Sequence, residues 1–145
     1  MSELNFQTGV KSYTVNGGEE ITFEPGSALF ANKVISAFER CQEATRNSGI
    51  DNAQDVEAAC EATIALEKAV RAEINAAFGY DVCAKVFPGT SAIAIAGGLP
   101  VWVNFIMAVV DEIDCNMDDS QEKASERIRK YTDKYANKYG KNVRK

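Results

Sequence analysis

The sequence of 145 residues predicts a mainly α-helical (α+β) fold, in which an N-terminal β-hairpin is followed by a bundle of four to five helices. Three observations predict this fold class. Near the N-terminus, β-branched and aromatic residues flank a turn that contains two glycines. After residue 27, apolar residues recur every three or four positions, as they do on a helix face. Hydrophobic residues make up 46% of the chain and charged residues 26%, which is typical of a globular domain. We expect one domain over residues 1–145, with the hairpin in 1–25, a helical core in 26–116, and a basic C-terminal helix and tail in 117–145.

The hairpin is predicted from two short runs, residues 10–15 and 19–24, on either side of Asn16-Gly17-Gly18. The glycines suit this turn because they adopt positive φ without steric cost. Leu4 and Phe6 either belong to the first strand or lead into it.

The first helix is expected to begin after Ser27, a good N-cap residue, and to end near Asn47-Ser48-Gly49. Its buried face is predicted to hold Phe30, Val34, Phe38 and Cys41.

A second helix is predicted from about residue 52 to residue 78, ended by Gly79. Its apolar stripe consists of Val56, Ala59, Thr63, Leu66, Val70, Ile74 and Ala77. Packing in the core of one chain and self-association into a homo-oligomer are both compatible with such a stripe. One or two further helical turns are expected within residues 80–87.

Residues 86–110 contain no charged side chain, in a chain of net charge −5. A membrane span is disfavoured because Pro88, Gly97-Gly98 and Pro100 interrupt the segment, and a helix from Pro100 to about residue 110 is too short to cross a bilayer. Asp111 follows immediately, where a span would favour basic anchors. We therefore expect an apolar loop that leads into a short helix, which either fills the core or binds another protein.

A final helix is predicted from Met117-Asp118-Asp119-Ser120 to about Tyr139. Residues 1–122 carry 7 basic and 19 acidic side chains, whereas residues 123–145 carry 9 basic and 2 acidic ones. The tyrosines and basic residues of this helix, Tyr131 and Tyr135 among them, either stack on and track a nucleic acid or form a buried stripe beside a solvated face. A third use is docking of the basic helix onto the acidic body of its own chain or of a partner. The acidic body would repel a nucleic acid, so we favour the stripe and expect Tyr131 and Tyr135 to contact protein.

No catalytic or metal-binding signature is present. The chain lacks histidine, which removes the commonest general base and most zinc sites. The glycines form no phosphate-binding pattern. Asp114-x-Asn116-x-Asp118 resembles the start of a calcium loop, but Asp119 and Ser125 stand where that loop needs glycine and glutamate. We expect no enzyme activity, no cofactor and no metal.

The four cysteines, at positions 41, 60, 83 and 115, show no CxxC spacing. No secretory signal precedes them, so they are expected to be reduced thiols in a cytoplasmic protein.

Aromatic and aliphatic side chains of the charge-free segment are the candidate contacts to a partner, because aromatic anchors dominate interface energetics. The alternative for each is a place in the core. The candidates are Phe87, Leu99, Trp102, Phe105 and Ile106.

Several segments, in this order, resemble one protein family. They are Ile21-Thr22-Phe23-Glu24-Pro25, Phe78-Gly79-Tyr80, Lys85-Val86-Phe87-Pro88-Gly89, Gly98-Leu99-Pro100-Val101-Trp102-Val103-Asn104-Phe105, and the basic, tyrosine-rich stretch 127–141. Together they resemble the tail assembly chaperone-type proteins of long-tailed phages and prophages of Gram-positive bacteria. The resemblance implies a non-enzymatic factor in the host bacterial cytoplasm. Such a factor binds the phage tape measure protein, keeps its apolar helices soluble, and helps the tail tube protein assemble around it.

Two other function classes remain open from the sequence. One is a structural component of a phage or prophage tail, which the same composition suits. The other is a small nucleic-acid-binding regulator, whose binding would weaken steeply with salt; for the reasons of charge given above, we regard nucleic acid as the less favoured partner.

Overall fold

The computed structural model describes residues 1–117 and 126. The chain is mainly helical with an N-terminal antiparallel hairpin, which confirms the predicted fold class. Strands β1 (Lys11–Thr14) and β2 (Glu20–Phe23) pair with Tyr13 opposite Ile21. Asn16 and Gly17 supply the positive φ angles of the turn, 50° and 73°.

The first two helices also lie where their end signals predict them. Helix α1 (Ala28–Arg46) begins at Ser27, whose hydroxyl accepts a hydrogen bond of 3.1 Å from the Phe30 amide. Helix α2 (Val56–Phe78) ends at Gly79, which has a φ of 83° and donates its amide to the Asn75 carbonyl.

The start of α2 is later than the sequence predicts. Residues 50–52 form the separate 3-10 turn η1 (Ile50–Asn52), and the Asp55 carboxylate then caps α2 by accepting from the Ala58 amide at 2.8 Å. The predicted helix from residue 52 therefore merged two elements.

The charge-free segment contains more regular structure than expected. After the one-turn helix α3 (Cys83–Val86), β3 (Ile95–Ala96) and β4 (Leu99–Pro100) form a small hairpin about Gly97-Gly98. Residues 101–117 then form one continuous helix. The predicted break between a short helix ending near residue 110 and a new helix opening at Met117 is wrong, because Asp111, Glu112 and Asp114 sit within this helix.

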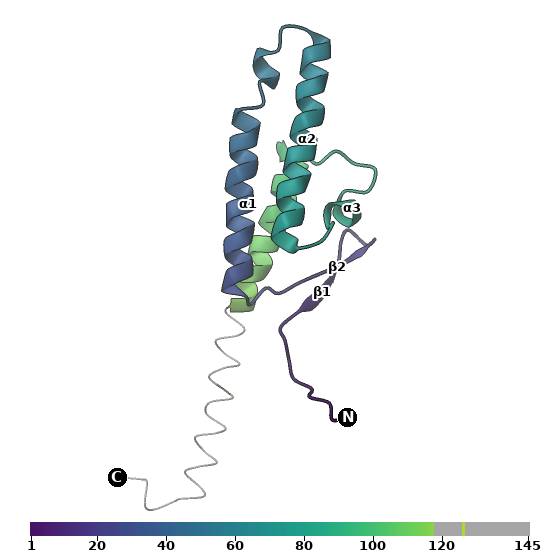
Figure 1. Cartoon of the computed structure of the whole chain (residues 1–145), viewed down its shortest axis with the longest axis vertical. Helices are drawn as coiled ribbons and strands as arrows, with labels where there is room; N and C mark the ends of the chain where they lie inside the picture. Colours follow the sequence, from purple (N-terminus) through teal and green to yellow (C-terminus); the bar gives the residue numbers. More distant parts are fainter. Residues whose placement is uncertain (118–125, 127–145) are drawn as a thin grey trace, which may run out of the picture.

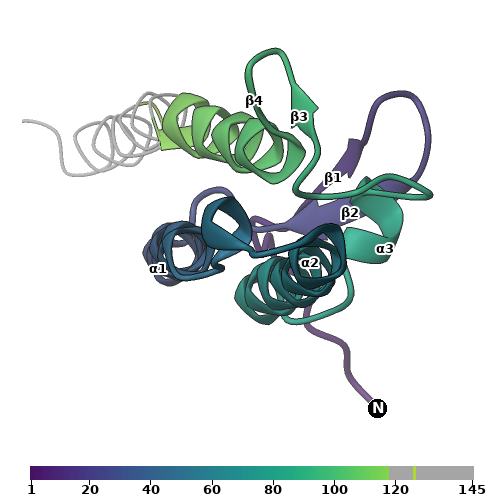
Figure 2. The same ribbon diagram turned by 90° about the horizontal axis from the view of Figure 1, so that it is seen from above.

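The hydrophobic core lies between α1, α2 and the 101–117 helix, with the β1–β2 hairpin closing one side (Figures 1 and 2). Val34, Val70 and Ile74 are fully buried between α1 and α2. The 101–117 helix contacts both α1 and α2. Trp102 packs against Phe38 of α1, with ring centroids 5.5 Å apart, and Phe105 packs against Phe78 of α2, with ring centroids 5.6 Å apart.

Among residues 1–117 and 126, no helix combines the length and the apolar character that crossing a bilayer requires. The predicted basic C-terminal helix, with Tyr131 and Tyr135, lies outside the described residues.

Candidate functional site

The Glu67 carboxylate attaches the charge-free segment to α2. It accepts hydrogen bonds from the Ser91 hydroxyl at 2.7 Å and from the backbone amides of Ala92 and Ile93 at 2.9 and 3.2 Å. It also pairs with Arg71, one helical turn further on, with an Nε–Oε2 distance of 2.6 Å. A single acidic side chain thus fixes the loop that leads to β3.

Arg71 adds a second attachment, because its guanidinium donates to the Thr90 carbonyl at 2.7 Å and lies over the Phe87 ring at 5.6 Å from its centroid. Burial of the Glu67 carboxyl opposes its ionisation, but the hydrogen bonds from Ala92, Arg71 and Ser91 outweigh burial and lower the pKa of Glu67 to about 2. These groups satisfy one another's hydrogen-bonding capacity and charge, so we assign them a structural role.

Two apolar grooves lie open on either side of the 101–117 helix. The first, which we call the inter-helix groove, lies between α1 and this helix and has a volume of about 240 Å³. Its residues are Val34, Ile35, Phe38, Ile106, Met107, Val110 and Asp111.

Two large apolar side chains at the margins of the inter-helix groove are exposed to solvent. Ile35 is 53% exposed and Met107 is 50% exposed. Of the residues that the structure describes, Asp111 is the one ionisable side chain that lines the groove. The groove therefore presents an almost purely apolar surface between two parallel ridges of helix side chains.

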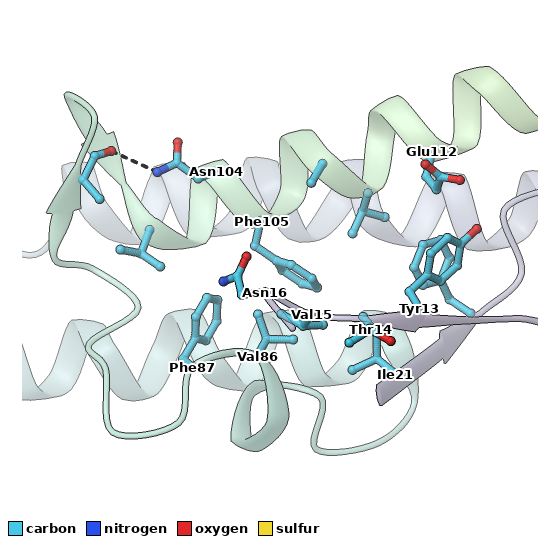
Figure 3. A pocket seen from close by; sticks show the side chains of 15 residues that line it. Tyr13, Thr14, Val15, Asn16, Ile21, Val86, Phe87, Asn104, Phe105 and Glu112 are labelled. Carbon is cyan, nitrogen blue, oxygen red and sulfur yellow. Dashed lines mark hydrogen bonds between the residues drawn. The ribbon is translucent and has the colours of Figure 1, made fainter. Parts of the chain in front are cut away.

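The second groove, which we call the strand-edge groove, has a volume of about 470 Å³ and lies between residues 13–16 and the opposite face of the 101–117 helix. Its helix wall includes Phe105, Ala108 and Glu112, and Phe87 closes it from below (Figure 3). At one end of this groove, the Asn104 side chain donates a hydrogen bond of 2.9 Å to the Ala96 carbonyl and so attaches the β3–β4 hairpin to the 101–117 helix.

The Tyr13 hydroxyl marks the other end of the strand-edge groove. It is buried and points toward the Glu112 carboxylate (Figure 3). Burial raises the pKa of Tyr13, and the negative charge of Glu112 raises it further. Nearby, the Lys11 ammonium donates to the Asn116 side chain at 2.7 Å and joins the hairpin to the 101–117 helix.

The candidate residues from the sequence are divided between the core and the grooves. Trp102 is buried against Phe38, so it occupies a place in the core, which was the alternative to a partner contact. Phe87 and Ile106 are also buried, yet Phe87 lines the strand-edge groove and Ile106 the inter-helix groove.

Phe105 is half-buried in the wall of the strand-edge groove, and Leu99 is 40% exposed on β4. Whether any of these residues contacts a partner stays a prediction. Tyr131 and Tyr135 lie outside the described residues.

Ile35 and Met107, the exposed side chains of the inter-helix groove, did not stand out from the sequence. The sequence contains only a weak indication of them. Ile35 directly follows the buried Val34, and Met107 directly follows the buried Ile106, so each widens an apolar helix stripe at its margin.

Within residues 1–117 and 126, no three acidic or cysteine side chains come together as a metal site. Cys41 and Cys83 are buried, and burial raises the pKa of each thiol to about 12.

Comparison of the chain with protein-family models, with curated proteins and with solved structures returned no match.

Proposed function

We propose that this protein is a non-enzymatic tail assembly chaperone of a long-tailed phage or prophage, acting in the bacterial cytoplasm. Its client is the tape measure protein, and it delivers that client to the tail tube protein. The observation that carries the proposal is the inter-helix groove, together with the family resemblance of the sequence.

The inter-helix groove suits an amphipathic helix. A client helix binds such a groove through apolar anchors three or four residues apart. The α1 wall offers Ile35 and Phe38 and the other wall offers Met107 and Val110, which are positions with that same spacing. The near absence of charge in the lining avoids the cost of desolvating an ion beneath an apolar client.

A chaperone with this role needs to release its client during tail assembly. The groove is short and open, so it covers only one or two helical turns of a long apolar helix. Several copies along one client would then protect it while each contact stays weak enough to be replaced by the tail tube protein.

The proposal is tested by co-expression with the tape measure protein of the same phage. The measured quantity is the fraction of tape measure protein that stays soluble. We expect the wild-type chain to raise this fraction and the double variant Ile35→Gln/Met107→Gln to lose most of the effect, because it makes the groove margins polar. The matched control is Val56→Gln/Ile64→Gln, which makes the same kind of change on exposed positions of α2, away from both grooves.

No gain in soluble tape measure protein at stoichiometric levels of the wild-type chain would overturn the proposal. Equal loss of the effect in the groove variant and in the α2 control would overturn the assignment of the groove. Thermal unfolding of both variants is the accompanying check, and each is expected to stay folded because it changes only exposed side chains.

A further inference from the structure

The strand-edge groove runs along an unpaired backbone edge. Tyr13 and Thr14 of β1 line the groove, and so do Val15 and Asn16 of the turn that follows, together with Ile21 and Phe23 of β2. Side chains of a strand alternate between its two faces, so a groove that contacts both Tyr13 and Thr14 lies at the edge of β1. In the described part of the chain, β1 pairs with β2 alone. Its other edge is a template for one more strand.

Residues 1–10, which we call the N-terminal arm, have the pattern of such a strand. Leu4 and Phe6 alternate with Asn5 and Gln7, so an extended arm carries both apolar side chains on one side. Leu4 is 88% exposed and Phe6 is 78% exposed. No charged residue occurs between residues 4 and 10, which suits insertion into an apolar groove.

The dimensions of the arm and the groove agree. Two residues apart on an extended chain, Leu4 and Phe6 are separated by about 7 Å. On the helix wall, Phe105 and Val109 are four residues apart, which is a rise of about 6 Å at 1.5 Å per residue. A volume of about 470 Å³ falls within the range of pockets that enclose small ligands, roughly 300–1,000 Å³, and has room for two such side chains.

In a single chain, the arm does not occupy its own groove. It leaves β1 at the Lys11 end, whereas the groove lies along residues 13–16, and both views show it projecting away from the helices (Figures 1 and 2). The arm is thus free to reach a neighbouring molecule.

We propose that the N-terminal arm of one copy adds as a strand to the β1 edge of a second copy and inserts Leu4 and Phe6 into its strand-edge groove. When each copy gives an arm and receives one, the contact closes into a two-fold symmetric dimer. The dimer stands apart from the proposed chaperone role, because that role uses the inter-helix groove on the other side of the helix.

Sedimentation velocity on the purified full-length chain tests the dimer. The wild-type chain is expected to dimerise. The double variant Leu4→Gln/Phe6→Gln should weaken dimerisation at least about a hundredfold, because it removes two apolar side chains from each of the two symmetric contacts. Ala108→Glu, which places a charge in the groove wall, should weaken it similarly. The control Val56→Gln/Ile64→Gln should leave dimerisation unchanged.

A disulfide experiment identifies which copy the arm enters. In a background with Cys60 and Cys115 changed to serine, one tagged chain carries Phe6→Cys and a second, differently tagged chain carries Ala108→Cys. Mild oxidation is expected to join the two tags, while pairing Phe6→Cys with Ala72→Cys, an exposed position of α2, should not.

Either of two results would overturn the proposal. One is a wild-type chain that stays monomeric, or a dimer that Leu4→Gln/Phe6→Gln does not weaken. The other is a disulfide that forms within a single chain carrying both cysteines but not between chains, which would place the arm in its own groove. Solubility of the tape measure protein is measured separately, so failure of the dimer and failure of the chaperone role are distinguishable.

Discussion

Replacing Glu67 by glutamine removes the charge that holds the charge-free segment against α2. The side chain keeps its size, but it no longer pairs with Arg71, and it cannot accept from Ser91, Ala92 and Ile93 with a full negative charge. We therefore expect Glu67→Gln to lower the free energy of unfolding.

The size of the loss follows from the pKa. Glu67 has a pKa of about 2 in the folded chain against an ordinary value of 4.5, and one pKa unit corresponds to about 1.4 kcal/mol. Ionised Glu67 thus stabilises the fold by about 3 kcal/mol at pH 7. Because the folded pKa is depressed, this contribution is complete above pH 4.5 and is lost as the pH falls toward 2. At pH 3 about half of it remains.

Urea unfolding, followed by the fluorescence of the single tryptophan, Trp102, measures this effect. At pH 7, we expect the free energy of unfolding of Glu67→Gln to be about 2–3 kcal/mol lower than that of the wild type. At pH 3, this difference should be about half as large. Glu73→Gln is the matched control on the same helix. Glu73 pairs with a largely exposed Arg40 at 3.5 Å, so its loss should cost less than about 0.5 kcal/mol.

Equal stability of Glu67→Gln and Glu73→Gln at pH 7 would contradict the stabilising role of the Glu67 charge. A difference between Glu67→Gln and the wild type that stays constant from pH 7 to pH 3 would contradict the depressed pKa of Glu67.

Three further predictions concern the fold. Trp102→Ala should destabilise the chain by about 3–5 kcal/mol in urea unfolding followed by circular dichroism, because it empties a buried site beside Phe38; a loss below about 1 kcal/mol would contradict its place in the core. Gly79→Ala should cost about 1–2 kcal/mol in the same assay, since Gly79 has a φ of 83°; an unchanged stability would mean that α2 ends differently. A thiol reagent should label Cys60 and Cys115 in the native protein but reach Cys41 and Cys83 only after unfolding; rapid native labelling of all four would contradict their burial.

Local signals in the sequence predicted the fold well where the structure depends on neighbours in the chain. The β1–β2 turn needs positive φ at Gly17, α1 needs the hydroxyl of Ser27, and α2 needs Gly79 at its end. Each requirement involves residues within four positions, so the residue types alone indicate it.

The structure of the charge-free segment was harder to predict from the sequence, because it depends on residues far away in the chain. Gly97-Gly98 was interpreted only as an interruption, although two glycines of positive φ are also typical of a hairpin turn. The loop before β3 is fixed by Glu67, which lies 24 to 26 residues earlier in the chain. No local pattern around Glu67 indicates that contact.

The grooves were beyond prediction for a similar reason. Aromatic residue type pointed to Trp102 as an anchor for a partner, but packing against Phe38 buries it. Ile35 and Met107 became candidates only once α1 and the 101–117 helix were seen side by side.

The chain order of the core elements has a consequence for synthesis. β1–β2 and the α1–α2 pair are formed from the first 78 residues, so they can fold while the ribosome is still making the charge-free segment. Trp102 and Ile106 then emerge next to a surface that already contains Phe38 and Val34. Among the described core elements, the charge-free segment is therefore produced last, when the surface that covers its apolar side chains is already made.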